Sequence, residues 1–352
     1  MLGISLPTGG MRMGSQQSNT SQSQKSSFYL TYPFSQTHLS TTTVSGIESF
    51  LKDWTERYSL INGKSSYIPL IAIYLKHCAP NNNDSHLRIL CKYLSIYYEL
   101  YTTFHNKNVS NEEYAALADY FVNGLKKRVT GQQLQSPTTP YEKACHNFFQ
   151  SLKKMRGIRF MKPFVWRAEH MFQSFKRLRG HSPQSISKQA FLKLREHLVS
   201  VYPYVELCAF LENINPHIFR NNYSRPYIER LEQLNSKITY LANEIGSFER
   251  DSQDKSRLNL VKFLIQEGWP ERHAKKIIAN AHNDAIREFQ KSVQKCDKWF
   301  KFNTDFQKYV AILKRVSHGC FHSTLELKER YRFSGMENAR LQLCCSEIHT
   351  LP

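Results

Sequence analysis

The sequence lacks the short motifs that mark several large enzyme classes. It contains no Gly-x-Gly-x-x-Gly segment, no P-loop and no nucleophile elbow. These absences argue against a dinucleotide-binding oxidoreductase, a P-loop NTPase and an α/β-hydrolase. No segment alternates apolar and polar residues between turn residues, and no repeat of fixed period occurs. Neither a β-sheet nor a repeat architecture is therefore indicated.

Long apolar runs and paired cysteines are also missing. No stretch of about 18 apolar residues occurs, and the first 27 residues contain no apolar run of signal-peptide length. The eight cysteines include no Cys-x-x-Cys pair, which excludes a zinc module or a disulfide framework. We therefore expect a cytoplasmic protein with buried free thiols. The adjacent Cys344 and Cys345 could be lipidated, but ordinary tail residues are the simpler interpretation.

What the sequence does contain is material for a large helical core. Hydrophobic residues make up 41% of the chain and aromatic residues 13%, which fits a folded protein. The Ser/Gln/Thr-rich residues 1–45 predict a disordered arm, residues 46–335 a single α-helical domain, and residues 336–352 a C-terminal tail. Apolar residues three and four apart predict an all-α bundle of about ten helices. The helical patterns cover 47–59, 67–78, 87–104, 112–126, 141–155, 160–179, 186–213, 226–251, 255–267, 270–292 and 296–317.

The net charge of +19 is unevenly distributed along the chain. Residues 126–179, here called the basic stripe, hold 13 Lys and Arg against only Glu142 and Glu169. Such a segment could attract nucleic acid, an anionic membrane surface or phosphate-bearing ligands. Because no nucleic-acid-binding motif accompanies the charge, solvated helix faces are the preferred interpretation. The sequence leaves a homo-oligomer open.

One polar pattern lies on a helix that is otherwise built for the core. Asn243, Ser247 and Asp251 are four residues apart, so each step turns by only about 40° and all three line one helix face. They offer an amide, a hydroxyl and a carboxylate oxygen, a set that suits Mg²⁺. Arg250 adds a cation where a metal-bound phosphate would lie. The opposite face carries Leu231, Leu234, Ile238, Leu241 and Ile245. A solvated polar face is the alternative, but polar groups on a core helix need partners.

This segment, YLANEIGSFERD, resembles the second metal-binding motif of class I terpene synthases, Asn-Asp-x-x-Ser-x-x-x-Glu. The resemblance puts Asn243, Ser247 and Asp251 on the three metal-ligand positions and implies Mg²⁺ as the cofactor. Arg250 falls where the family often has lysine. Glu244 replaces the second aspartate, which is not a ligand.

Three further segments resemble the same family in the same order. In KLREHLVSVYPYVEL, Arg195 matches the pyrophosphate-sensing arginine and Pro203 the family's proline, while Leu198 and Ser200 replace a threonine and a glycine. Residues 258–278 resemble the Asn-Leu-Val helix and the helix after it. Arg330–Tyr331 resembles the terminal pair that clamps the diphosphate. The resemblance covers roughly residues 140–333.

The resemblance implies a class I terpenoid synthase-like bundle around a central cavity. Its expected activity is Mg²⁺-dependent ionisation of a prenyl diphosphate of 10 to 20 carbons, followed by cyclisation. Arg195, Arg330 and Tyr331 would be the catalytic residues. We expect aromatic side chains to line the cavity and to stabilise a carbocation. The candidates are Tyr97, Tyr98, Tyr101, Phe104 and Phe210.

The chain departs from the family at the aspartate-rich motif. The corresponding segment reads ELYTTFH, with Tyr101, Thr102 and His105 on the three aspartate positions. Glu99 would point about 200° away around the helix. This departure keeps two alternatives to an active synthase open. One is a catalytically silent relative that binds prenyl diphosphate, and the other is a basic protein that binds nucleic acid or a membrane surface.

Overall fold

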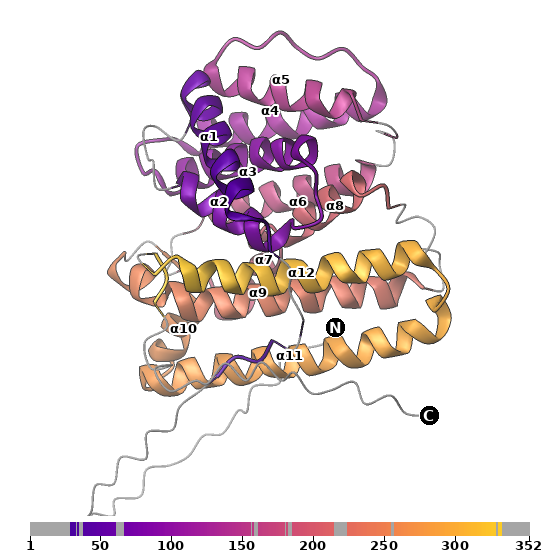
Figure 1. Ribbon diagram of the computed structural model, residues 1–352. Coiled ribbons are helices and arrows are strands. Elements are labelled where there is room, and N and C mark those ends of the chain that lie inside the picture. The colour runs from indigo at the N-terminus through magenta and orange to yellow at the C-terminus, as the bar shows by residue number, and fades with distance from the viewer. Residues whose placement is uncertain are drawn as a thin grey trace, which may run out of the picture.

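The fold is all-α, as the sequence predicts. The computed structural model describes residues 29–32, 34, 38–60, 67–155, 157, 161–179, 181, 185–214, 224–254, 257–328 and 330–332, which form twelve helices and no strand (Figure 1). The helices are α1 (Thr41–Arg57), α2 (Tyr67–Cys78), α3 (Asp84–His105), α4 (Asn111–Thr130), α5 (Pro140–Lys153), α6 (Lys162–Arg179), α7 (Lys188–Leu198), α8 (Val201–Leu211), α9 (Arg225–Gln253), α10 (Leu260–Gln266), α11 (Glu271–Phe300) and α12 (Thr304–Glu326).

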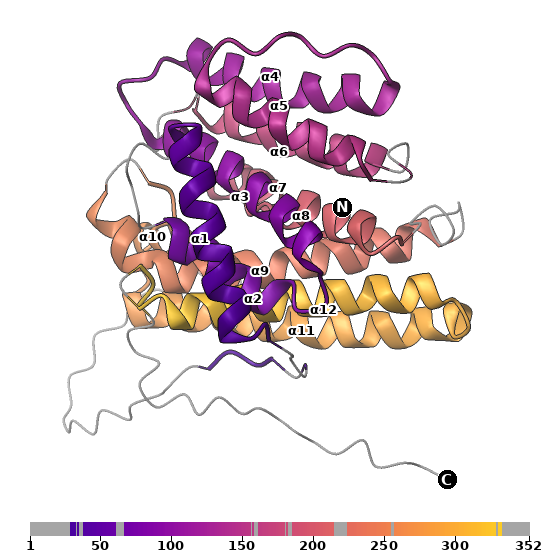
Figure 2. The ribbon, with the colours of Figure 1, turned by 45° about the horizontal axis from the view of Figure 1, so that its top comes forward.

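The helices stack in layers across the bundle. The long helices α9, α11 and α12 lie side by side at one end, and α4 and α5 lie at the other (Figure 2). Helix α9 packs against α7, α8, α10, α11 and α12. Its side chains Leu231, Leu234 and Ile238 are fully buried. The polar trio therefore does belong to a core helix, as its apolar face predicts.

The predicted helix over 186–213 is wrong, because two helices occupy this segment. Helix α7 ends at Leu198, and Ser200 takes a left-handed conformation with φ +63° before α8 begins at Val201. Pro203 explains the break. Proline has no backbone N–H and its ring would collide with the carbonyl group of Val199 in a continuous helix, whereas the first turn of a new helix tolerates it.

The prediction of a disordered arm to residue 45 is wrong for the part that the structure describes. Leu30, Tyr32 and Phe34 are buried against the bundle, and α1 already begins at Thr41. Asn283 of α11 accepts a hydrogen bond from the Thr31 backbone N–H (2.9 Å) and donates one to the carbonyl oxygen of residue 29 (2.9 Å). These hydrogen bonds satisfy backbone groups that would be hydrated in a disordered arm. Composition alone gives no sign of such a partner elsewhere in the chain. Residues 1–28 and the tail 336–352 lie outside the described residues.

Two further expectations concern thiols and membranes. The described cysteines are all free, and five of them are buried: Cys78, Cys91, Cys145, Cys208 and Cys296. Cys344 and Cys345 lie outside the described residues. Among the described helices, none combines the length and the apolar character that a membrane span requires.

Helices α2 and α12 approach each other most closely at Gly319. A Cβ atom on this residue would lie 2.5 Å from the Sγ atom of Cys78 and 2.8 Å from the carbonyl group of His77. We expect Gly319→Ala to lower the free energy of unfolding by about 1–3 kcal/mol, because the two backbones must move apart. Gly46→Ala in α1 is the matched control, since no atom lies within 4 Å of its Cβ position. It should raise stability by about 0.5–1 kcal/mol. Urea unfolding of both variants tests this, and equal shifts would contradict it.

Candidate active site

A cavity of about 470 Å³ lies within the bundle and is lined from helices α2, α3, α6, α7, α9 and α12. Its wall is rich in aromatic side chains, among them four of the five predicted from the sequence, Tyr97, Tyr98, Tyr101 and Phe104. The fifth, Phe210, is buried in α8 but does not line the cavity. Such a volume is typical of a small-molecule site.

Two members of the polar trio of α9, Asn243 and Asp251, line this cavity, whereas Ser247 lies behind them and is hydrogen-bonded to Asp251. Ser247 Oγ donates to Asp251 Oδ2 over 2.7 Å. Asn259, the N-cap of α10, donates from Nδ2 to both of these atoms over 3.3 Å. Asn243 Oδ1 accepts a hydrogen bond from Arg195 (2.8 Å). The sequence placed Asn259 in the Asn-Leu-Val segment without giving it a role. The sequence signal that could have identified Asn259 is its place directly before a helix, where asparagine is a favoured N-cap.

Arg195 is held in place by a buried carboxylate. Its Nε atom lies 2.5 Å from Glu244 Oε1, and the other Glu244 oxygen accepts the Leu260 backbone N–H (2.6 Å). Burial raises the pKa of Glu244, and the charge of Arg195 opposes that rise. Burial would lower the pKa of Arg195, but Glu244 raises it overall. Glu244 is thus a positioning residue, which agrees with its place at a position that is not a metal ligand.

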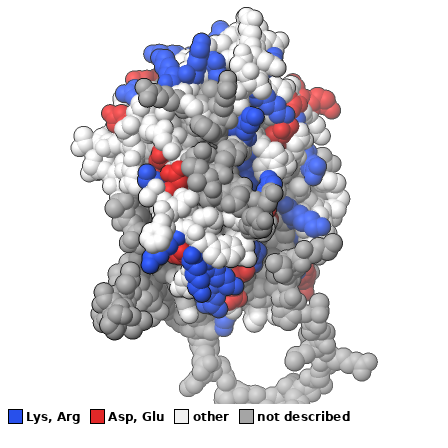
Figure 3. All heavy atoms as spheres, turned by 90° about the vertical axis from the view of Figure 1, so that its right-hand side faces the viewer, with Lys and Arg blue, Asp and Glu red and all other residues white. Residues whose placement is uncertain are grey.

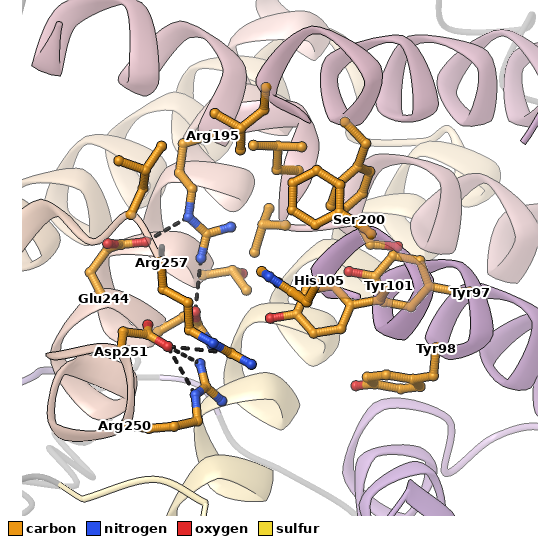
Figure 4. Close-up of a pocket in the computed structure, with 18 of the residues that line it drawn as sticks. Tyr97, Tyr98, Tyr101, His105, Arg195, Ser200, Glu244, Arg250, Asp251 and Arg257 are labelled. Carbon is orange, nitrogen blue, oxygen red and sulfur yellow. Dashed lines mark hydrogen bonds and ion pairs between the residues drawn. The ribbon is translucent and has the colours of Figure 1, made fainter. Parts of the chain in front are cut away.

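Two arginines surround the carboxylate of Asp251. Arg250 contacts Asp251 Oδ1 through Nε (2.9 Å) and a terminal nitrogen (2.8 Å), and Arg257 contacts the same oxygen over 3.5 Å (Figure 4). Burial would raise the pKa of Asp251, but Arg250 and the Ser247 hydrogen bond lower it overall. Arg257 was missed by the sequence analysis, because it lies in the α9–α10 connection, where no periodicity marks it.

The segment after α12 brings Arg330 and Tyr331 to the same end of the cavity. The Arg332 backbone N–H donates to the carbonyl oxygen of Gly246 in α9 (2.9 Å). The guanidinium of Arg330 lies over the rings of Tyr67 (5.4 Å) and Tyr331 (5.8 Å). Burial would raise the pKa of Tyr331, but Arg330 and Arg250 lower it overall.

Two cationic N–H groups at this end have no acceptor among the residues that the structure describes. They are Arg250 Nη1 and Arg330 Nε, and both are buried. A buried donor on a charged group is costly to leave unpaired, so these atoms indicate a site for an anionic ligand.

The wall opposite α9 carries no carboxylate. Of the three residues on the expected aspartate positions, Tyr101 and His105 line the cavity and Thr102 does not (Figure 4). Burial and the charge of Arg257 lower the pKa of His105 to about 3. Glu244 and Asp251, both in α9, are the sole carboxylates in the described lining.

The α9 residues fit one Mg²⁺ ion by the chemistry of their donors. Asn243, Ser247 and Asp251 offer three neutral or anionic oxygens. Ser247 Oγ and Asp251 Oδ2 lie 2.7 Å apart. Adjacent ligands of an octahedral Mg²⁺ are about 2.9 Å apart, given bonds of about 2.0–2.1 Å. The α3 wall does not fit further ions, because a phenol and an imidazole replace the carboxylates there. No cluster of three His, Cys, Asp or Glu with metal-binding geometry occurs within the described residues.

Comparison with known proteins identifies the family. Residues 103–288, more than half of the chain, match the family model described as terpene synthase family 2, C-terminal metal binding. The chain belongs to the terpene synthase family. The match includes α9 with its polar trio and begins inside α3. No curated protein matches the sequence significantly.

Solved structures of microbial class I terpene synthases share this terpene synthase fold. The linalool/nerolidol synthase from Streptomyces clavuligerus, solved with 2-fluorogeranyl diphosphate, superposes with a TM-score of 0.72 at 14% identity, over 86% of this chain and 100% of that one. The 2-methylisoborneol synthase from Streptomyces coelicolor A3(2), solved with Mg²⁺ and 2-fluoroneryl diphosphate, gives 0.73 at 12% identity, over 88% and 98%. The germacradien-4-ol synthase from Streptomyces citricolor gives 0.69 at 15% identity, over 86% and 99%.

At least four of the 13 cations in the basic stripe of this terpene synthase make contacts within the protein. Lys126 pairs with Glu169, Lys176 with Asp119 and Arg167 with the buried Glu232, while Arg179 binds backbone carbonyl oxygens at the end of α3. Figure 3 shows Lys and Arg in separate groups on one face, several with Asp or Glu beside them. These four cations serve contacts within the fold, and the family match does not favour the nucleic-acid or membrane alternative.

Proposed function

We propose that this terpene synthase ionises a prenyl diphosphate of 10 to 20 carbons, with loss of diphosphate and cyclisation of the resulting cation. The observation that carries this proposal is the pair of acceptor-free cationic donors, Arg250 Nη1 and Arg330 Nε, at one end of an aromatic cavity. An elongated ligand with an anionic head and an apolar tail matches that distribution of polarity.

The head and the tail of the substrate meet different residues. Arg195, Arg330 and Tyr331 bind the diphosphate, and their fixed positive charge stabilises the charge that develops on it as the carbon–oxygen bond breaks. Mg²⁺ held by Asn243, Ser247 and Asp251 would neutralise part of the same charge. Aromatic faces such as those of Tyr97 and Tyr98 stabilise the allylic cation through cation–π contacts.

Incubation of the protein with Mg²⁺ and diphosphates of 10, 15 and 20 carbons tests this proposal. Released diphosphate and the hydrocarbon or alcohol products are measured together. We expect diphosphate release from at least one substrate. No release and no product from any of the three would reject the proposal.

A second candidate function is prenyl diphosphate binding without turnover. The α3 wall favours it, because no described carboxylate is present there to hold further metal ions. A ligand at 100 times its Kd should then stabilise the protein by about 2.7 kcal/mol while no diphosphate is released.

Asn243→Ala tests whether either function uses this site. The variant removes the amide oxygen that Arg195 contacts. We expect the stabilisation by prenyl diphosphate to shrink by about 1 kcal/mol or more, which thermal unfolding with and without ligand measures. Asn280→Ala, on the exposed face of α11, is the matched control and should leave the stabilisation unchanged. An unchanged ligand effect in Asn243→Ala would contradict the site assignment.

A further inference from the structure

The cavity wall carries an excess of positive charge. Its described lining includes two carboxylates, Glu244 and Asp251, against six cationic side chains. The cationic residues are Lys107, Arg179, Arg195, Arg250, Arg257 and Arg330.

Arg179 is committed to the protein itself. It donates to backbone carbonyl oxygens of residues 103, 104, 106 and 109 and to the side chain of Asn111. Arg195, which also belongs to the proposed diphosphate site, is held by Glu244 and Asn243. Because Lys107 lies exposed beyond the end of α3, three half-buried arginines remain, and two of them, Arg250 and Arg257, contact Asp251.

Arg257 is the member of this group that faces the α3 wall. It lies on the α9–α10 connection, with Nε 3.2 Å from Asp254 Oδ2 and a terminal nitrogen 3.5 Å from Asp251 Oδ1. Figure 4 shows the guanidinium groups of Arg250 and Arg257 side by side, with Tyr101 and His105 across from them. Arg257 therefore occupies the region between the α9 carboxylate and the wall that has lost its carboxylates.

This arrangement is suited to an anion and unfavourable for additional metal ions. A divalent cation on the α3 side would meet a phenol and an imidazole in place of carboxylates, and it would be repelled by two guanidinium groups. A diphosphate meets the opposite situation. One guanidinium group can donate hydrogen bonds to two phosphate oxygens at once. The N–H groups at Arg250 Nη1 and Arg330 Nε have no acceptor among the described residues and are available for such bonds.

We propose that Arg257, together with Arg250 and Arg330, binds the diphosphate group directly, so that diphosphate binding does not require a divalent cation. This inference rests on the proposed function, since it concerns the same site. It assigns to Arg257 a ligand-binding role.

Isothermal titration of the full-length protein with inorganic diphosphate tests the inference. In EDTA we expect a Kd within about tenfold of the value in Mg²⁺. Arg257→Gln should weaken metal-free binding by about tenfold or more, the loss typical of a charge-assisted hydrogen bond. Arg257→Lys, which keeps the charge but loses the fork, should fall between the two. Arg330→Gln is a second variant with the same expected loss.

The control and the outcomes separate this inference from the proposed function. Arg230→Gln removes an arginine of α9 that pairs with Glu288 at the surface, and it should bind like the wild type. Thermal unfolding establishes that each variant is folded. Binding that disappears in EDTA and returns with Mg²⁺ would overturn the inference, as would metal-free binding that Arg257→Gln and Arg330→Gln leave intact. Metal-free diphosphate binding without any diphosphate release from prenyl substrates would instead reject the proposed turnover and uphold the inference.

Discussion

At pH 5 the protein is expected to be markedly less stable than at pH 7. Three histidines, His77, His282 and His318, are almost completely buried, with exposed fractions of 2%, 0% and 2%. Burial lowers their pKa values to about 4, about 4 and about 3. The partners of His77 and His282, Glu326 and Asn283, oppose this effect without reversing it. All three imidazoles are therefore neutral in the folded protein at neutral pH.

The direction of the pH effect follows from which state binds protons first. An unfolded histidine has a pKa of about 6.5, so below that pH the unfolded chain is protonated while the folded protein is not. Stability is full above about pH 6.5, falls as the pH decreases, and stops falling near pH 4, where the folded histidines also titrate. Each group contributes about 1.4 kcal/mol per pH unit. Together the three histidines lower the free energy of unfolding by about 6 kcal/mol between pH 6.5 and pH 5. The total free energy of unfolding of a typical protein is about 5–15 kcal/mol.

Urea unfolding at pH 7, 6 and 5 measures this loss. His318→Asn is the informative variant, because neither nitrogen of His318 has a hydrogen-bond partner among the described residues, so the substitution removes no hydrogen bond seen there. It should reduce the loss of unfolding free energy between pH 7 and pH 5 by the contribution of one of the three buried histidines. His273→Asn, on the exposed face of α11, should leave the dependence unchanged. An equal free energy of unfolding at pH 7 and pH 5 would show that the buried histidines do not remain neutral.

The α9 trio could be predicted from sequence because it is a local feature. Asn243, Ser247 and Asp251 share a face through the helical period alone, and the apolar residues on the opposite face place that helix in the core. The resemblance to the family also predicts Arg195 and Arg330 as site residues, because the family's motifs occur in a fixed order along the chain. The structure brings both arginines to the cavity that Asn243 and Asp251 of the trio line.

The features that could not be predicted depend on contacts between distant segments. Arg257 belongs to a short connection, and nothing local shows that its side chain reaches Asp251. The docking of residues 29–32 depends on Asn283, some 250 residues away in the sequence. The break at Ser200 had a local signal in Pro203, but the apolar periodicity on both sides of it suggested one helix. Contacts between distant segments determine these features, whereas apolar periodicity shows only which residues share one face of a helix.

Asp251→Asn is expected to have the largest effect on activity and to separate two roles of the site. It removes the only carboxylate of the α9 trio, on which a divalent ion there would depend. Diphosphate release from a prenyl substrate in Mg²⁺ should fall by about 100-fold or more. The same change removes the negative charge that Arg250 and Arg257 now neutralise. Affinity for inorganic diphosphate in EDTA should therefore be maintained or increase.

The opposite directions of these two effects make Asp251→Asn a sharp experiment. Simple unfolding would reduce both turnover and metal-free binding, so a loss of one with retention of the other cannot arise from it. Glu249→Gln removes a carboxylate two residues earlier on α9, one that pairs with Arg332 and does not line the cavity, and it should change neither quantity more than about threefold. Turnover at the wild-type rate in Asp251→Asn would show that the α9 trio does not hold a catalytic metal ion. If metal-free diphosphate affinity falls together with turnover while thermal unfolding shows the variant to be folded, Asp251 instead positions Arg250 and Arg257 for the ligand.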